Sequence, residues 1–262
     1  MSNPSRSCLI GYSGFVGSNL APKHSFTDLF RSSNIHDIRG RQYDLLVCAG
    51  APAEKWKANQ QPEVDRANID RLIQHLSEAR ASRAILISTV DVYPVIRDVD
   101  ESYDCASLPN HAYGTNRLRL EASFLKLFAE AYIVRLPAVF GPGLKKNVIY
   151  DLLHDNCLDA INPESTFQYY DVTRLWDDLE AIQKNQLAVV NLVTEPLGTK
   201  RIVDTYFPLK QVGPGKTAPA HYDLRSRYAE VLGGVPGYRF TSDQVLAGLG
   251  AYIQSTGRGV AA

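Results

Sequence analysis

The chain lacks any long apolar run and any net charge, and each absence excludes a class of partner. Its longest apolar runs, such as residues 84–87 and 187–190, are far shorter than the ~18–20 residues that span a bilayer. Over 262 residues, 28 Lys and Arg balance 28 Asp and Glu, so composition indicates no basic surface for nucleic-acid phosphates. We therefore expect neither a membrane nor a nucleic acid as a partner.

The chain also lacks paired cysteines. Cys8, Cys48, Cys105 and Cys157 are widely and irregularly spaced, with no CxxC and no spacing suited to zinc. We expect reduced thiols and no metal site. The N-terminal residues pass from a polar tail into an apolar stretch without a small-residue cleavage site, which favours a cytoplasmic protein without a signal peptide.

Short apolar runs alternate with longer amphipathic segments, a pattern typical of an α/β protein with a parallel sheet. The sequence predicts strands at residues 8–10, 28–30, 44–48, 83–88, 132–136 and 187–193. It predicts helices at residues 69–76, 113–130 and 242–254, the last capped by Thr241 or Ser242.

A glycine-rich turn follows the first predicted strand and opens a helix. In a dinucleotide-binding turn, the first glycine permits the tight turn and the second lets backbone N–H groups approach a pyrophosphate, while the third allows close packing of helix on strand. The helix N-terminus then favours the negative phosphates. The segment is predicted to bind a dinucleotide through Gly11, Tyr12, Ser13, Gly14, Phe15, Val16 and Gly17.

Arg31 indicates which dinucleotide is bound. It stands twenty residues after Gly11, where an acidic residue holds the ribose 2′-hydroxyl of NAD in the usual fold, and Ser32 and Ser33 follow it. An arginine with hydroxyls suits a 2′-phosphate, so NADP(H) is favoured over NAD(H). Alternatively, Arg31 is a solvated residue at a strand end.

Two later segments follow the glycine turn: Ser88-Thr-Val-Asp-Val-Tyr93 at the end of the fourth predicted strand and Tyr113-Gly-Thr-Asn-Arg117 at the start of the next helix. Together with the turn, they resemble the extended short-chain dehydrogenase/reductase superfamily, which contains nucleotide-sugar epimerases, dehydratases and reductases. The resemblance covers about residues 7–205. It implies a Rossmann-type doubly wound parallel sheet formed by residues 1–140 and 166–205, with a small substrate-binding lobe from residues 141–165 and 206–262.

The resemblance implies roles for Thr89 and Tyr113. The Thr89 hydroxyl would hydrogen-bond the reacting oxygen of the substrate, and Tyr113 would exchange a proton with it. The family motif is YxxxK, but Arg117 replaces the lysine. Arginine keeps the charge and can bond ribose hydroxyls, although it resists losing a proton. Two functions therefore stay open: an NADP(H)-dependent oxidoreductase or epimerase acting on a nucleotide-linked sugar, and an NAD(P)-binding sensor that has lost catalysis.

The residues at positions 90 and 91 limit which reactions of a sugar we expect. Asp91 stands where the resembling dehydratases carry a proton-abstracting Glu, but Val90 replaces the Asp that precedes that Glu. Dehydration is thus disfavoured, and epimerisation and keto reduction remain. The resemblance implies that the Asp91 carboxylate removes a proton beside a ketone. Alternatively, Asp91 caps the loop or forms a salt bridge there.

The resemblance also implies further contacts. Phe167 or Gln168 stands where the epimerases have a diphosphate-binding Arg, which departs from their pattern. Family members often form homodimers through the two long helices. The remaining expected contacts are Ala49, Gly50, Ala51, Asn68 and Pro137 with the cofactor, and Lys145, Lys146 and Asn147 with the substrate.

Overall fold

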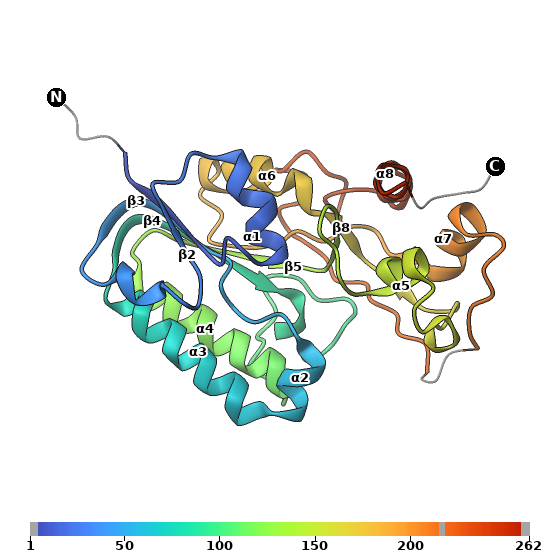
Figure 1. The fold of residues 1–262 in the computed structure, drawn as a ribbon, viewed down its shortest axis with the longest axis horizontal. Helices are drawn as coiled ribbons and strands as arrows, with labels where there is room; N and C mark the ends of the chain where they lie inside the picture. The colour runs from blue at the N-terminus through green and yellow to red at the C-terminus, as the bar shows by residue number, and fades with distance from the viewer. Residues whose placement is uncertain (1–4, 215–217, 258–262) are drawn as a thin grey trace. The chain divides into compact units, whose positions relative to one another are not determined.

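The computed structural model describes residues 5–214 and 218–257, and the chain divides into two compact units (Figure 1). Within the described residues, the first unit comprises Met1–Pro94, Tyr103–Leu136 and Leu175–Val190. The second comprises Val95–Ser102, Pro137–Arg174 and Asn191–Ala262. The assignment of one part of the chain to the cofactor and another to the substrate stays a prediction.

A six-stranded sheet of order β2-β1-β3-β4-β5-β9 organises the first unit. The strands are β1 Ser7–Ile10, β2 Asp28–Phe30, β3 Gln42–Cys48, β4 Arg80–Thr89, β5 Ala131–Leu136 and β9 Val189–Asn191. The neighbouring pairs from β2 to β5 are parallel. The predicted α/β fold with a Rossmann-type sheet is confirmed.

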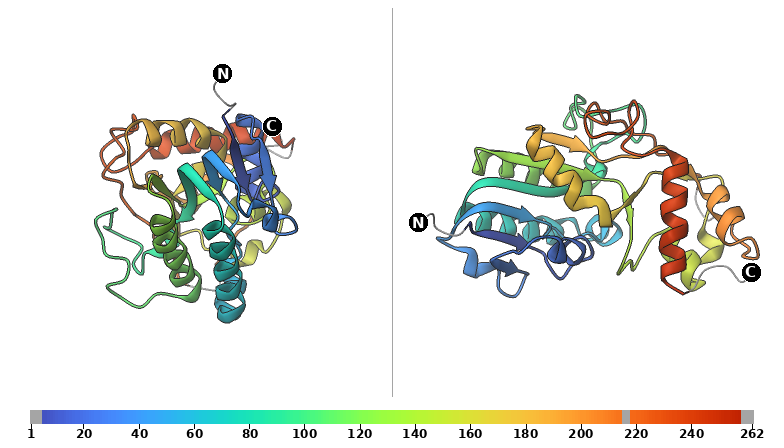
Figure 2. Two further views of the ribbon diagram at one scale, coloured as in Figure 1. Left: turned by 90° about the vertical axis from the view of Figure 1, so that its left-hand side faces the viewer. Right: turned by 90° about the horizontal axis from the view of Figure 1, so that it is seen from above.

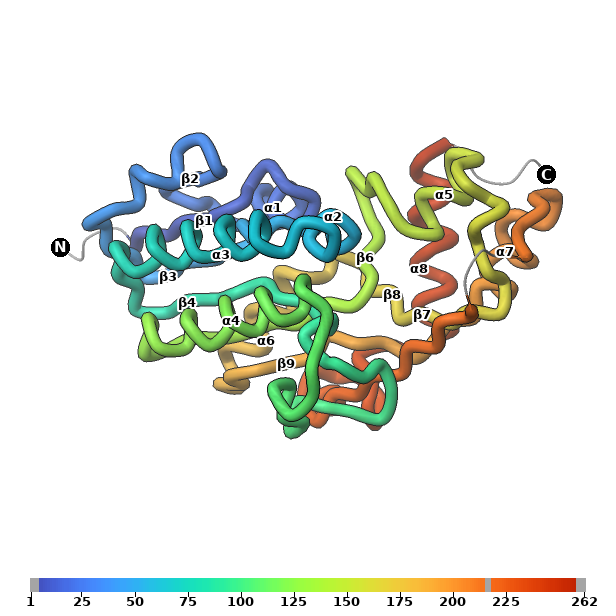
Figure 3. The backbone as a smooth tube through the Cα atoms, turned by 90° about the horizontal axis from the view of Figure 1, so that it is seen from below, coloured from blue at the N-terminus to red at the C-terminus, as the bar shows by residue number. Residues whose placement is uncertain are grey.

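Helices cover both faces of this sheet. Figures 1 and 3 show α3 (Pro62–Ser77) and α4 (Ala112–Leu127) side by side across one face. Figures 1 and 2 show α1 (Phe15–Leu20) and α6 (Leu175–Lys184) on the other. A short helix, α2 (Lys55–Gln60), precedes α3. Apolar side chains spaced three and four residues apart turn toward the sheet, and the core includes Ile69, Leu76, Leu120, Phe124, Leu46 and Leu86.

Helix α6 was not predicted from the sequence. Helical spacing does separate its buried apolar residues, Leu175, Trp176, Leu179 and Ile182. The turn residues that precede them led to the prediction of an irregular segment. The strand predicted at residues 187–193 is shorter in the structure, where β9 covers the three residues Val189–Asn191. Cys8 and Cys48 lie buried in β1 and β3, as expected.

The second unit contains two small sheets and three helices among its described residues. Strand β6 pairs in parallel with β8, and β10 pairs antiparallel with β7. The elements are β6 Ala138–Phe140, α5 Val148–His154, β7 Thr166–Phe167, β8 Tyr169–Asp171, β10 Leu197–Gly198, α7 Thr199–Tyr206 and α8 Ser242–Ser255. In the described parts of the chain, no helix has the length and apolar character to cross a membrane. The same residues include no cluster of three or more His, Cys, Asp or Glu side chains that could hold a metal.

The N-cap of α8 provides a stability test. Thr241 Oγ1 accepts a hydrogen bond from Gln244 N at 3.3 Å, and Gln244 Oε1 accepts one from Thr241 N at 2.9 Å. Thr241→Ala removes one half of this capping box, so we expect it to lower the free energy of unfolding by about 1 kcal/mol in urea denaturation. Thr241→Ser keeps the hydroxyl and should stay near the parent value. Equal loss in both variants would contradict the capping role.

Candidate functional site

The candidate site lies at the carboxyl edge of the main sheet. Ile10 at the end of β1 is in register with both Phe30 and Cys48, and Cys48 is in register with Leu86. Strand β1 has β2 on one side and β3 on the other, so the order of the strands reverses there. In open α/β sheets, ligands bind outside the carboxyl ends of the strands at such a reversal. The segments that follow β1, β2, β3 and β4 all reach this edge.

Close backbone contacts exclude a side chain at the first and third glycines of the turn. Gly11 has a φ of +85°, and a Cβ there would lie 2.3 Å from Ala49 O. A Cβ on Gly17 would lie 2.0 Å from Gly11 O. Only glycine fits these two positions, and the turn leaves Ser13 and Gly14 exposed with Tyr12, Phe15 and Val16 half-buried.

Arg31 lies beside this turn. Gly11 N donates to Phe30 O at 2.7 Å, and Arg31 is the next residue after Phe30. The Arg31 side chain is exposed, with Nε donating to Ser33 Oγ at 3.0 Å. Ser32 is exposed as well. A cation and two hydroxyls therefore stand at the carboxyl end of β2, while the preference for NADP(H) stays a prediction.

The Thr89–Asp91 segment leaves β4 and is fixed against the start of α4. Thr89 Oγ1 accepts from Asp91 N at 3.1 Å and so begins a short 3₁₀ turn. Asn110 Nδ2 donates to Asp91 O at 2.9 Å and to Val92 O at 3.0 Å. A Cβ on Gly114 would lie 2.2 Å from Asp91 O. This close contact holds Tyr113, the residue before Gly114, near the Thr89–Asp91 segment.

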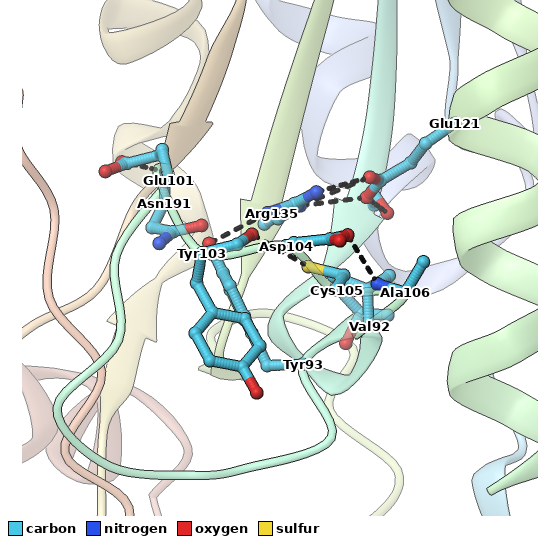
Figure 4. Close-up of polar contacts among 12 residues, drawn as sticks. Val92, Tyr93, Glu101, Tyr103, Asp104, Cys105, Ala106, Glu121, Arg135 and Asn191 are labelled. Atoms are coloured by element: carbon cyan, nitrogen blue, oxygen red, sulfur yellow. Dashed lines mark hydrogen bonds and ion pairs between the residues drawn. The ribbon is translucent and has the colours of Figure 1, made fainter. Parts of the chain in front are cut away.

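A buried ion pair anchors both flanks of that segment. Arg135 Nη2 lies 2.7 Å from Glu121 Oε2, and Figure 4 shows the two side chains facing one another between β5 and α4. Ser88 Oγ donates to Glu121 Oε1 at 2.5 Å, and Arg135 Nη1 donates to Tyr93 Oη at 2.8 Å. Cys105 is buried close by, and burial raises the pKa of its thiol. Residues 88 and 93 are thus held at either end of the candidate catalytic turn.

Arg117 is committed to an ion pair between α4 and α3. Its Nη1 lies 2.8 Å from Asp65 Oδ2 and its Nη2 lies 3.0 Å from Asp65 Oδ1. Nη2 also donates to Pro52 O. Only 3% of the Arg117 side chain and 5% of the Asp65 side chain are exposed. The predicted contact of Arg117 with the cofactor ribose stays a prediction.

Opposing effects act on the pKa values of the two groups beside Arg117. Burial favours a higher pKa for Asp65, but hydrogen bonds from Arg117 and Asn116 bring it below its usual value. Burial raises the pKa of Tyr113, and the Arg117 guanidinium, 4.2 Å from the centre of the tyrosine ring, opposes that rise. Tyr113 is therefore a weaker acid here than a solvated tyrosine.

Three further residues at this site, besides Asp65, Asn110 and Glu121, were not predicted from the sequence. Lys55 Nζ lies 2.6 Å from Asp91 Oδ1, and Asn59 Oδ1 accepts from Tyr113 N at 3.0 Å. His111 Nδ1 accepts from Gly114 N at 2.9 Å and caps α4. Burial and the charge of Lys55 lower the pKa of His111. No motif marks Lys55, because its partner is 36 residues away in sequence.

The other predicted cofactor contacts are distributed over both units. Ala49, Gly50 and Ala51 are half-buried after β3, where Ala49 N donates to Ile10 O at 2.9 Å. Asn68 is half-buried on α3, and Pro137 begins a segment of the second unit. The contacts of these residues with a cofactor stay predictions.

The predicted substrate-binding residues lie in the second unit. Lys145 and Lys146 are exposed. Asn147 caps α5, with its Oδ1 accepting from Ile149 N at 3.0 Å and Tyr150 N at 3.2 Å. Their contacts with substrate stay predictions.

Gln168 has a structural role in the second unit. Its Nε2 donates to Thr194 O at 2.6 Å and to Leu224 O at 2.8 Å, and its Oε1 accepts from Leu224 N at 2.9 Å. The side chain is buried and holds three segments together. Both ends of its amide are therefore used within this unit.

Solved structures of nucleotide-sugar enzymes resemble this chain over nearly its whole length. The dTDP-4-dehydrorhamnose reductase of Bacillus anthracis, in complex with NADP, has 13% identity and a TM-score of 0.72, with 97% of this chain and 99% of that chain covered. The UDP-N-acetylglucosamine 4-epimerase of Methanobrevibacter ruminantium, in complex with UDP-N-acetylmuramic acid, has 14% identity and a TM-score of 0.70, covering 97% and 98%. MoeE5, in complex with UDP-glucuronic acid and NAD, has 17% identity and a TM-score of 0.72, covering 97% and 99%.

This chain has the fold of the extended short-chain dehydrogenases/reductases. No protein-family model and no curated protein sequence matches it. The glycine turn follows β1, and Thr89 ends β4, at the carboxyl edge of the sheet, while the roles of Thr89 and Tyr113 stay predictions. Arg117, in contrast, has a buried carboxylate partner.

The buried pair between α3 and α4 has an exposed counterpart that serves as a control. Arg119 Nε lies 2.8 Å from Asp70 Oδ1 on the same two helices, and both of those side chains are well exposed. We expect Asp65→Asn to lower the free energy of unfolding by about 3–5 kcal/mol, because it leaves the Arg117 charge buried without a counter-ion. Asp70→Asn should cost less than about 1 kcal/mol. Urea denaturation of both variants checks this difference, and similar losses would contradict it.

Proposed function

We propose that this protein binds NADP(H) and reduces a carbonyl group of a sugar carried on a nucleotide. The observation that supports this most strongly is the convergence of two sets of residues at one sheet edge. The glycine turn ends β1 there, and Thr89 with Tyr113 is fixed beyond β4 at the same edge. A dinucleotide at the switch point would extend its nicotinamide along this edge.

The residues at the turn fit a dinucleotide. The backbone at Gly11 and Gly17 has no room for a side chain, and the exposed Ser13 and Gly14 leave the outer side of the turn open. Backbone N–H groups of such a turn can approach a pyrophosphate closely. Arg31 and Ser33 offer a cation and a hydroxyl for a ribose 2′-phosphate. NADPH, when bound, supplies the hydride.

Thr89 and Tyr113 would handle the substrate oxygen. The Thr89 hydroxyl oxygen accepts from Asp91 N, which leaves its proton available for donation, since a hydroxyl has one donor and two acceptor positions. Tyr113 would donate its phenolic proton to the same oxygen as hydride reaches the carbonyl carbon. The anchoring of Ser88 and Tyr93 by Glu121 and Arg135 keeps this geometry fixed.

The Lys55–Asp91 ion pair favours reduction over epimerisation. Epimerisation beside a ketone would need Asp91 to remove a proton from carbon, and one oxygen of that carboxylate is already bound to the Lys55 ammonium, 2.6 Å away. Reduction needs no base at this position. Keto reduction is therefore the reaction that the arrangement supports best.

A sensor that binds NAD(P) without turnover is the second candidate. The observation that favours it is that the cation on the Tyr113 helix is Arg117, a buried guanidinium paired with Asp65, which resists losing a proton. Burial also raises the pKa of Tyr113. Turnover distinguishes the two candidates.

Replacing Arg31 tests the choice of cofactor. We expect the parent to bind NADPH more tightly than NADH, and Arg31→Ser to weaken NADPH binding at least about tenfold by removing a charged hydrogen bond to the 2′-phosphate. NADH binding should change little. Nicotinamide fluorescence titration measures all four dissociation constants. An unchanged preference for NADPH would show that Arg31 does not contact the 2′-phosphate.

Replacing Tyr113 tests catalysis. Tyr113→Phe keeps the ring over Arg117 but removes the proton donor, so we expect NADPH oxidation with keto-sugar nucleotides to fall by a factor of about 100 or more. NADPH affinity should stay near the parent value. Equal rates in parent and variant would contradict the catalytic role, and a parent that binds NADPH without any turnover would favour the sensor.

A further inference from the structure

We propose that His111 is a positioning residue for Tyr113 that works only as a neutral imidazole. Its ring caps the first turn of α4, two residues before Tyr113, and protonation of the ring would release that cap. The role needs no contact of His111 with cofactor or substrate. The inference rests on the proposed reductase function and adds to it a loss of turnover in mild acid.

The hydrogen bond at the start of α4 fixes the protonation state of His111. Gly114 N lies 2.9 Å from His111 Nδ1, and a backbone N–H can only donate. Nδ1 therefore accepts and carries no proton, so the ring is the neutral tautomer with its proton on Nε2. An imidazolium has a proton on both nitrogens and cannot accept this bond. Protonation of His111 and the cap on Gly114 N thus exclude one another.

The first turn of α4 depends on side chains to bind its N–H groups. The helix begins at Ala112, and the first four N–H groups of a helix have no partner within it. His111 Nδ1 binds Gly114 N, and Asn59 Oδ1 accepts from Tyr113 N at 3.0 Å. Gly114 is buried, and a buried N–H without an acceptor is unfavourable. Loss of the His111 cap would therefore shift the turn that carries Tyr113.

The same segment sets the position of α4 against the Thr89–Asp91 turn. Asn110 Nδ2 donates to Asp91 O at 2.9 Å, and Asn110 Oδ1 accepts from His111 N at 2.7 Å. Gly114 approaches Asp91 O so closely that a Cβ on it would lie 2.2 Å away. His111 thus stands between two residues that both lie against Asp91 O. A shift of the first turn of α4 would move Tyr113 relative to Thr89.

Among the residues that the structure describes, the charged or titratable groups facing His111 come from α2, the 3₁₀ turn and α4. Lys55 on α2 and Asp91 on the 3₁₀ turn are paired at 2.6 Å, and the Tyr113 ring lies 6.3 Å from the His111 ring. Burial and the charge of Lys55 lower the pKa of His111, while Asp91 opposes that change. A cation at a helix N-terminus is also unfavourable. The ring therefore stays neutral until the pH falls below the ordinary histidine pKa of about 6.5.

The first test uses the protein without cofactor. In His111→Asn, the asparagine oxygen can still cap α4 but does not titrate. The control is His36→Asn, because His36 is an exposed imidazole whose Nε2 lies 3.2 Å from Asp37 Oδ1. In the parent and the control, we expect the Gly114 amide signal in ¹H–¹⁵N NMR to move between about pH 8 and about pH 5, as the His111 ring takes up a proton. In His111→Asn that signal should stay fixed. A parent signal that does not move, or an equal movement in His111→Asn, would overturn the inference.

Turnover provides the second measurement. Tyr113 stays protonated in this range, because burial raises the pKa of its hydroxyl above the usual value, so its own titration does not lower the rate. With NADPH and a keto-sugar nucleotide, kcat of the parent should fall about tenfold or more from about pH 7.5 to about pH 5, because the proton donor is displaced. His111→Asn should keep most of its kcat and match the parent in NADPH affinity at each pH. The same acid loss in both proteins would overturn the role of His111 and leave the reductase function standing, whereas a parent that binds no NADPH would overturn the reductase function itself.

Discussion

The ion pair between Arg117 and Asp65 determines how this site is built. It joins α4 to α3 with both partners almost fully buried, so neither helix can shift without exposing or separating two charges. Because Arg117 also bonds Pro52 O, the segment after β3 is tied to the same pair. The helix that carries Tyr113 is therefore fixed to its neighbours, and the cation one turn beyond Tyr113 is a guanidinium, which resists losing a proton. Both a reductase and a protein that only binds NAD(P) are therefore considered as functions.

The rest of the candidate site is stabilised by contacts that leave little freedom at the reacting end. Glu121 and Arg135 hold the residues on both sides of the Thr89–Asp91 segment. Gly114 brings α4 against Asp91 O more closely than any side chain would allow. Pre-positioned groups of this kind are what proton transfer to a developing alkoxide requires.

The elements that depend on local sequence were predictable. Apolar runs gave the strands at β1 to β5, and the glycine spacing gave the turn after β1. Thr241 was expected as a cap and forms a full capping box. The missed features depend on partners distant in sequence. Asp65 and Lys55 contact residues 52 and 36 positions away, and no periodicity reports such pairs. The cap that Asn147 forms on α5 was not predicted either, and its contact with substrate stays a prediction.

The central claim is that a nicotinamide dinucleotide binds at the turn after β1. The most direct measurement is a two-dimensional ¹H–¹⁵N NMR titration of the protein with NADPH. We expect the backbone amide signals of Gly11, Gly14 and Gly17 to shift together and saturate, with changes also at Arg31. Absence of shifts at the glycine turn, whether no signal moves or signals move only elsewhere in the chain, would contradict it.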